Sequence, residues 1–207
     1  MANFYEKHIL PGLLTCACGS PAIMRQRALV VPQAQGKVLE LGIGGGLNLA
    51  FYDPRKVESV TGVDPSPELR AKAMAAPHDP SLAVRVEAGA AEALPFADQS
   101  FDSVVCTFTL CSVSDPARAL AEAKRVLKPG GQFLFCEHGL SPEPQVAKWQ
   151  RRLDPVWSRL AGGCHLNRPV SQTLVAAGLR PSPVEKAYLH KAPKIAGWVE
   201  WGAAQPG

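Results

Sequence analysis

The chain has 207 residues, of which 46% are hydrophobic and 19% are charged. These proportions are typical of a folded globular protein and exclude an intrinsically disordered chain, and the length favours one domain with its own core. The formal net charge is only +4, and the 22 Lys and Arg residues are scattered along the sequence. No nucleic-acid partner is expected, because a phosphate backbone selects a clustered basic surface.

The most apolar N-terminal stretch runs from Ile9 to Ala17 and is interrupted by Pro11 and Gly12. It has about half of the roughly 20 residues that a membrane-spanning helix needs. It also lacks the long apolar region and small-residue cleavage site of a secretory signal. We therefore expect no transmembrane segment and a cytoplasmic location.

The six cysteines are expected to be free thiols, since a cytoplasmic location is reducing and so few cysteines would make a thin disulfide framework. Cys16 and Cys18 are one residue apart rather than two, and no matching pair of Cys or His follows at a zinc-binding spacing. The sequence therefore predicts no metal site.

From Lys37 onward, short β-branched runs alternate with longer helix-like stretches. This alternation is typical of a parallel sheet whose crossover helices cover both faces. Five runs are predicted to be strands, at residues 38–41, 58–64, 83–87, 101–107 and 132–137. Residues 1–35 precede this pattern with two possible short helices, so we expect a helical cap segment at 1–35 and the main domain at 36–207.

Two helices are predicted in the second half of the chain. Asp115 and Pro116 are suited to the N-cap and first turn of a helix, and apolar residues then recur at helical spacing until the Lys128–Gly131 segment ends it. An amphipathic stretch from Val146 to Leu160 predicts the second helix. A Gly-Gly pair at 162–163 follows it, and we expect this segment to cover the carboxyl edge of the sheet.

A glycine-rich turn, with glycines at positions 42, 44, 45 and 46, lies where the first predicted strand should give way to a helix. Glycines at such a turn allow the backbone to approach a ligand closely. A dinucleotide fingerprint would need one more glycine at position 47, which is Leu47, so a nicotinamide cofactor becomes the second choice. Asp64 ends the second strand, where a carboxylate can accept hydrogen bonds from a ribose.

Each of these two features has a simpler explanation. Glycine-rich turns occur without ligands, and an acidic residue at a strand end is often only a helix N-cap. The glycine turn, Asp64 and the later segments 94–96 and 127–131 nevertheless occur in one order at compatible spacing. Together they predict a site for an adenosine-containing ligand.

Three segments, residues 39–46, 89–96 and 125–131, resemble the class I S-adenosylmethionine-dependent methyltransferases. The resemblance extends over most of the chain. It implies a single-domain, Rossmann-like α/β fold with a mostly parallel seven-stranded sheet and helices on both faces. It also implies S-adenosylmethionine as the cofactor, with S-adenosylhomocysteine as the product.

Within that class, the sequence is similar to the quinone-biosynthesis type and, more closely, to the microsomal alkyl-thiol methyltransferases. The closer resemblance is carried by residues 106–113, by Glu137-His138, by residues 153–157 and by Gly163-Cys164. The microsomal relatives carry a hydrophobic N-terminal anchor, which the short, proline-interrupted segment here does not supply. Peripheral contact with a membrane is left open.

The class resemblance implies that Gly42, Gly44 and nearby backbone hold the methionine part of the cofactor, Asp64 its ribose and Pro65 one side of its adenine. An Asp commonly follows the glycine equivalent to Gly89 in the quinone type, but Ala90 stands there in this sequence. The Ala91 backbone and Glu92 are the alternatives for recognising adenine. The residues predicted to bind the cofactor are Glu40, Gly42, Gly44, Gly46, Asn48, Asp64, Pro65, Ala91, Glu92 and Thr107.

For the acceptor, His138 is predicted to be a catalytic base, because it directly follows the fifth strand and ligands bind beyond the carboxyl ends of such strands. Cys111, Trp157 and His165 are predicted to bind the acceptor. Each has a simpler interpretation: both histidines can be hydrogen-bonded in loops, a cysteine is often a small buried hydrophobe, and Trp157 can belong to the core with Trp149.

The leading hypothesis is direct in-line methyl transfer from S-adenosylmethionine to a small, largely apolar acceptor, with a thiol among the candidates. A sulfonium carries an activated methyl group, so neither a metal nor a covalent enzyme intermediate is required. The alternatives are an NAD-type oxidoreductase and a non-catalytic adenosyl-binding scaffold. The acceptor atom and the oligomeric state are left open.

Overall fold

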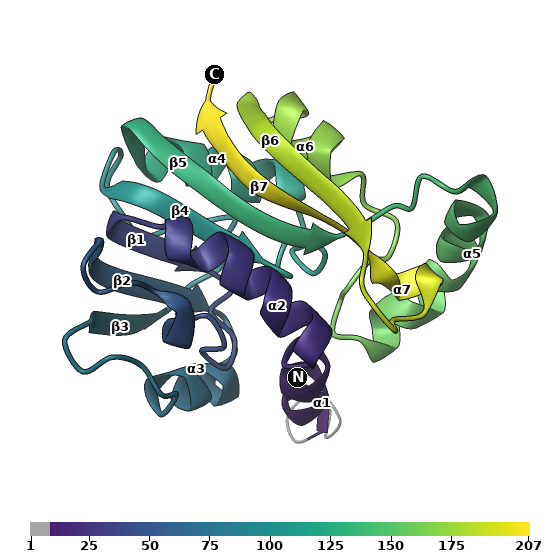
Figure 1. Cartoon of the computed structure of the whole chain (residues 1–207), viewed down its shortest axis with the longest axis horizontal. Helices are drawn as coiled ribbons and strands as arrows, with labels where there is room; N and C mark the ends of the chain where they lie inside the picture. The colour runs from purple at the N-terminus through teal and green to yellow at the C-terminus, as the bar shows by residue number, and fades with distance from the viewer. Residues whose placement is uncertain (1–8) are drawn as a thin grey trace.

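The computed structural model describes residues 9–207, which fold around one seven-stranded sheet (Figure 1). The strand order is β3-β2-β1-β4-β5-β7-β6, and β7 is antiparallel to both of its neighbours while β1 to β5 pair in parallel. The prediction of a mostly parallel seven-stranded sheet is confirmed. The strands are β1 (Gly36–Leu41), β2 (Val57–Asp64), β3 (Ala83–Ala88), β4 (Phe101–Thr107), β5 (Leu127–His138), β6 (Leu179–Tyr188) and β7 (Trp198–Pro206).

Helices cover both faces of the sheet, with α2 on one side and α4 and α6 on the other (Figure 1). Each face has its own core: Val30 of α2 and Ala73 of α3 are fully buried on one, and Leu120 of α4 and Leu174 of α6 on the other. The helices are α1 (Leu10–Cys18), α2 (Pro21–Val30), α3 (Pro67–Met74), α4 (Pro116–Val126), α5 (Pro144–Leu160), α6 (Val170–Ala176) and α7 (Lys194–Gly197).

The central strands contain long apolar runs because both of their faces are covered. Val38 and Leu39 are adjacent in β1 and point to opposite faces, yet both are completely buried. All five predicted strands are confirmed within a few residues, except that β5 begins at Leu127, five residues earlier than predicted. The strand β6, which was not predicted, contains Pro181 and Pro183 and lies at the edge of the sheet, where proline is tolerated.

The helix predicted directly after the glycine turn is wrong. Residues 42–48 form turns, and only a short 3-10 helix, Leu49–Phe51, follows them. The segment turns inward at Asn48, whose completely buried side chain hydrogen-bonds Glu40 and Thr107. A ligand at this turn would therefore meet irregular backbone rather than the N-terminus of an α-helix.

Within residues 9–207, none of the helices combines the length and the apolar character needed to cross a bilayer.

The N-cap of α4 provides a test of the local sequence interpretation. The Asp115 side chain accepts a hydrogen bond from the Arg118 backbone at 3.0 Å, as predicted for an N-cap. We expect Asp115→Ala to lower the free energy of unfolding by about 1 kcal/mol, because the backbone N–H loses its partner. Urea denaturation measures this change. Asp115→Asn, which keeps a capping oxygen, is the matched control, and equal losses in both variants would contradict the capping role.

Candidate cofactor and acceptor site

A cavity of about 500 Å³ lies at the carboxyl ends of four parallel strands. Gly42, Pro65, Gly89 and Phe108 all line it, and each stands directly after β1, β2, β3 or β4. Ligands of open α/β sheets bind in this position, and the volume is in the range of small-molecule sites. We call it the main cavity.

Asp64 is fixed at the floor of the main cavity by backbone on both sides. One carboxylate oxygen accepts a hydrogen bond from Gly44 N at 3.0 Å, and the other accepts one from Ser66 N at 2.9 Å. Burial raises the pKa of Asp64, although these two hydrogen bonds oppose the shift. Each carboxylate oxygen can accept a second hydrogen bond, so an oriented acceptor pair is available for the two hydroxyls of a ribose.

The glycine turn approaches the cavity with backbone that other residues adopt poorly. Gly42 and Gly44 have φ of 62° and 56°. A Cβ at Gly42 would lie 2.5 Å from Thr109 Oγ1, whereas a Cβ at Gly44 would approach nothing closer than 3.8 Å. Position 42 therefore requires glycine for both conformation and space, and position 44 for conformation.

Three residues predicted to bind the cofactor lie beside the cavity rather than on its wall. Gly46 packs against the end of α3, where a Cβ would lie 2.7 Å from that of Ala76. Glu40 and Asn48 are buried beneath the turn and hydrogen-bond each other at 2.9 Å. Their role in this structure is to support the turn. The predicted residues on the wall are Gly42, Gly44, Asp64, Pro65, Ala91, Glu92 and Thr107.

Beneath the turn, a buried polar network joins α2 to β1 and β4. Arg27 donates to Asn48 Oδ1 at 2.7 Å and to Thr107 Oγ1 at 2.5 Å, and Asn48 in turn donates to Glu40. Tyr52 donates its hydroxyl proton to the other Glu40 oxygen at 2.7 Å. Burial raises the pKa of Glu40 to about 7, against the opposing effect of these hydrogen bonds and of the Arg27 charge.

Arg27 and Phe108 are among the residues of the cavity wall that were not identified from the sequence. Arg27 is nearly buried, and its guanidinium lies 5.2 Å from the centroid of the Phe108 ring. Phe108 has a φ of 53°, a conformation that is costly in a non-glycine residue and that surrounding contacts must hold in place. Its N–H donates to Cys136 O, and the next N–H, that of Thr109, donates to Glu137 Oε1. No local sequence pattern distinguishes either residue.

The adenine side of the predicted site contains Pro65, Ala91 and Glu92. The Glu92 carboxylate accepts hydrogen bonds from the Ser114 and Asp115 backbone at 2.8 and 3.3 Å. It therefore shapes this wall by fixing the loop that precedes α4, in addition to any contact with a ligand.

The residues predicted for the acceptor lie together, but outside the wall of the main cavity. His138 and Cys111 line a second, much smaller cavity of about 10 Å³. Trp157 is 38% exposed and Trp149 is 53% exposed, so the interpretation of these two as core is wrong. His165 is held at the surface by Asp154, 2.8 Å from its Nδ1.

Comparison with known proteins gives the site its chemical context. Residues 39–135 match the family model described as a methyltransferase domain. A thiol S-methyltransferase of Rattus norvegicus is 43% identical over 135 residues, 63% of this chain and 54% of that protein. A ubiquinone/menaquinone biosynthesis C-methyltransferase of Geotalea daltonii is 36% identical over 107 residues, 49% of this chain and 45% of that protein. The crystal structure of an S-adenosylmethionine-dependent methyltransferase of Thermotoga maritima superposes with a TM-score of 0.66 at 23% identity, over 97% of this chain and 99% of that one.

The fold and the matched domain are those of the class I methyltransferases, whose cofactor is S-adenosylmethionine. Residues 39–135 of the chain match the methyltransferase domain, and the relatives that align with this part of the chain are named methyltransferases. The alignments with the rat and human thiol S-methyltransferases span 54–64% of the length of those relatives. Methylation by the whole protein, and the identity of its acceptor, are therefore proposals.

Asp64 provides the test of the cofactor position. We expect Asp64→Ala to weaken S-adenosylhomocysteine binding by about 1–3 kcal/mol, because a charged acceptor for the ribose is lost. Isothermal titration calorimetry measures the affinity. Asp79→Ala, at an exposed carboxylate outside the cavity wall, is the control. Unchanged affinity in a folded Asp64→Ala protein would place the ribose elsewhere.

Glu40 predicts a pH dependence of stability. Its pKa is about 7 in the fold and 4.5 in its ordinary state, so the folded protein holds the proton more tightly than the unfolded chain. The stability that the tighter binding of this proton gives to the fold is fully present below pH 4.5 and is lost as the pH rises through about 7. Over that window we expect wild type to lose up to about 3 kcal/mol of unfolding free energy relative to Glu40→Gln.

Denaturation curves of the two proteins between these pH values measure that difference. Glu58→Gln, at an exposed glutamate on the same sheet, is the control for the loss of a carboxylate. A wild-type curve that runs parallel to the Glu40→Gln curve would show that Glu40 has the same pKa in the fold as in the unfolded chain.

Proposed function

We propose that this protein transfers the methyl group of S-adenosylmethionine to a small, largely apolar thiol by direct in-line displacement. One observation carries the choice of acceptor: the charged side chains on the described wall of the main cavity are already engaged. Asp64 accepts from Gly44 and Ser66, Glu92 accepts from the loop before α4, and Arg27 donates into the buried network.

An acceptor at this site receives little help in losing a proton. Amines and phenols have ordinary pKa values near 10, so nearly all of an amine is protonated at neutral pH and nearly all of a phenol is un-ionised. A thiol has an ordinary pKa of about 8.5, and a few per cent is already thiolate at neutral pH. A thiolate is also an intrinsically strong nucleophile. The thiol is therefore the acceptor that requires least from this cavity.

The wall also limits the size and polarity of the acceptor. Leu10, Leu47, Phe108 and Val113 add apolar surface to a volume of about 500 Å³, which the cofactor must share. A small, apolar molecule fits such a space better than a segment of a polymer. The matched thiol S-methyltransferases support the same chemistry, since their names describe methyl transfer to sulfur.

The chain's own groups would act by positioning. Bound S-adenosylmethionine supplies a methyl group that is already activated as a sulfonium. Asp64 and the glycine turn would fix its adenosine and methionine parts, while α1 and α2 would close the cavity and exclude water, so that the thiolate and the methyl carbon are held in line. Displacement forms the new sulfur–carbon bond as the sulfonium–carbon bond breaks.

His138, predicted as a catalytic base, is placed differently from that expectation. Its Nε2 lies 3.0 Å from Cys164 Sγ, and it is absent from the wall of the main cavity. Cys111 and Trp157, predicted to bind the acceptor, lie close to Cys164 rather than on that wall. We therefore assign direct contact with the acceptor to the wall residues and not to His138.

The acceptor assignment is tested with labelled S-adenosylmethionine and a matched panel of an alkyl thiol, a phenol and an amine of similar size. We expect methyl transfer to the thiol, with a rate that rises about tenfold for each pH unit below the thiol pKa, as the thiolate fraction does. Binding of S-adenosylhomocysteine but not of NAD is the control for the cofactor site. Transfer to the amine or phenol alone would refute the thiol, and cofactor binding with no transfer would favour a scaffold.

A further inference from the structure

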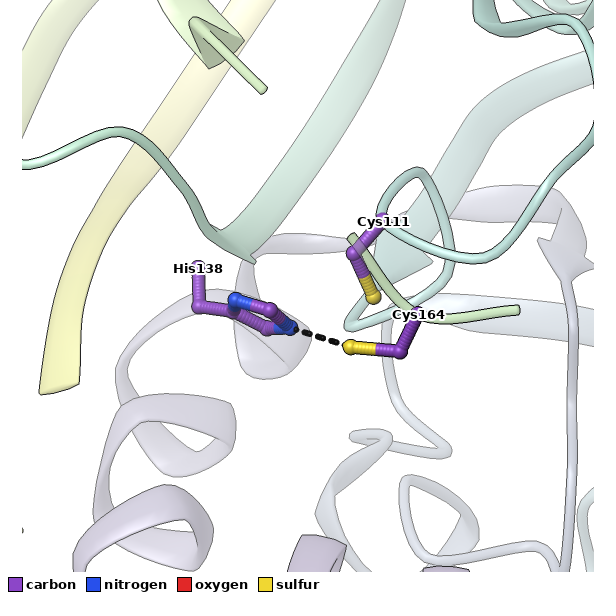
Figure 2. Close-up of side chains that lie close together, drawn as sticks. All are labelled: Cys111, His138 and Cys164. Carbon is purple, nitrogen blue, oxygen red and sulfur yellow. Dashed lines mark hydrogen bonds between the residues drawn. The ribbon is translucent and has the colours of Figure 1, made fainter. Parts of the chain in front are cut away.

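Three side chains able to bind a metal ion meet at the carboxyl edge of the sheet (Figure 2). Cys111 lies in the loop after β4, His138 ends β5, and Cys164 lies in the loop after α5. Their ligand atoms, two Sγ atoms and one ring nitrogen, all lie within 4.8 Å of one another. We call these three residues the Cys–His–Cys cluster.

The separations are close to those around a zinc ion. Zinc–sulfur and zinc–nitrogen bonds of roughly 2.3 and 2.0 Å, at tetrahedral angles, place neighbouring ligand atoms roughly 3.5–3.8 Å apart. In the cluster, His138 Nε2 lies 3.0 Å from Cys164 Sγ, and the remaining separations do not exceed 4.8 Å. Shifts of about 1 Å or less in side-chain position would bring the three atoms around one ion.

The donor set selects a thiophilic cation. Two thiolates and one imidazole are soft or borderline ligands, which suit zinc and disfavour magnesium and calcium. Two thiolates would also neutralise a divalent charge, which matters because Cys111 and Cys164 are both buried. Figure 2 shows the Cys164 sulfur directed toward the ring of His138, with the Cys111 sulfur close to both.

The two loops that carry the cysteines are tied together independently of the cluster. His165 N donates to Cys111 O at 2.7 Å. Arg168 donates to Leu110 O and, at 2.8 Å, to Val113 O. Because these contacts join the loop of Cys111 to the loop of Cys164, the two thiols would need little ordering on binding an ion.

The helix α5 fixes the second loop from the other side. The two Asp154 oxygens lie 2.8 Å from His165 Nδ1 and 2.7 Å from Leu166 N. Trp157, one turn further along α5, directs its indole N–H toward Cys164 Sγ at 3.5 Å. Hydrogen bonds to coordinating sulfur are typical partners of metal-bound thiolates.

A small space adjoins two of the three side chains of the cluster. The small cavity of about 10 Å³ is lined by Cys111 and His138, and it can hold at most one water molecule. Three protein ligands and one water are the composition of catalytic zinc sites, whereas structural sites are closed by four protein ligands.

From these contacts we propose that Cys111, His138 and Cys164 form a binding site for one zinc ion, with a water molecule as the fourth ligand. The sequence predicted no metal because the three residues are separated by 26 or more positions and follow no known zinc spacing. This site goes beyond the proposed methyl transfer, and its occupancy is measured without an acceptor.

Cobalt(II) is the spectroscopic probe for the full chain after reduction and treatment with a chelator. We expect one equivalent of cobalt to give the charge-transfer absorption of thiolate ligands and the visible bands of tetrahedral coordination, and zinc to displace it. Competition with a chromophoric chelator then gives the zinc affinity. Absence of thiolate–cobalt absorption in reduced, folded protein would overturn the proposal.

Substitution identifies the ligands. We expect Cys111→Ser, Cys164→Ser and His138→Ala each to weaken zinc binding by about a hundredfold or more, since loss of outer partners alone costs roughly 10–100-fold. Cys16→Ser, at an exposed cysteine outside the cluster, is the matched control and should bind zinc as wild type does. Binding retained by both cluster cysteine variants would also overturn the proposal. S-adenosylhomocysteine binding by each variant reports separately on the fold and the cofactor site.

Wild-type protein provides a measurement that needs no variant. Zinc should protect Cys111 and Cys164 from alkylation while Cys16 remains reactive, as mass spectrometry of the peptides would show. Equal alkylation of Cys111 and Cys164 with and without zinc contradicts the site. A disulfide between these two that reforms after reduction, with no metal uptake, would assign the cluster to redox chemistry instead.

Discussion

A buried arginine connects the N-terminal helices to the strands that carry the site. Arg27 is 5% exposed, and its partners Asn48 and Thr107 lie 21 and 80 residues away in the sequence. A buried charge must be hydrogen-bonded, and removing a partner so that a buried polar group is left unsatisfied costs about 1–3 kcal/mol, and more for a charged group. The network therefore restricts where α2 can lie on the sheet, and with it the shape of the cavity wall.

The same network explains why the glycine turn is irregular. In a helix beginning after Gly44, the backbone groups would hydrogen-bond one another. Here the Asn48 side chain instead points inward and hydrogen-bonds Arg27 and Glu40. Tyr52 closes the network from the following loop. Local structure at the turn is thus set by long-range polar contacts, which override the helix expected after the first strand of this fold.

The difference between local sequence patterns and long-range contacts also separates what the sequence predicts from what it does not. The buried strands are predicted because their apolar runs are local, and Asp64 is predicted because its position at a strand end is local. Arg27 and Phe108 were missed because their roles arise from contacts with residues far away in the chain. Strand β6 was missed because Pro181 and Pro183 are permitted only by its place at the edge of the sheet, which depends on the whole topology. The three members of the Cys–His–Cys cluster were each noticed separately, but only the tertiary fold brings them together.

The N-terminal helices share the wall of the main cavity with the sheet, since Leu10, Thr15 and Cys18 of α1 line it together with Gly42. A ligand that fills the cavity would touch both parts, so its binding free energy includes the docking of α1. Thermodynamic linkage makes the effect reciprocal. If the bound ligand favours the docked position of α1 by some factor, then release of α1 lowers the affinity for the ligand by the same factor. Hydrogen exchange in α1 would consequently slow as the cavity fills, although the helix is far in sequence from Asp64. The first helix would in this way report occupancy of the site to the surface of the molecule.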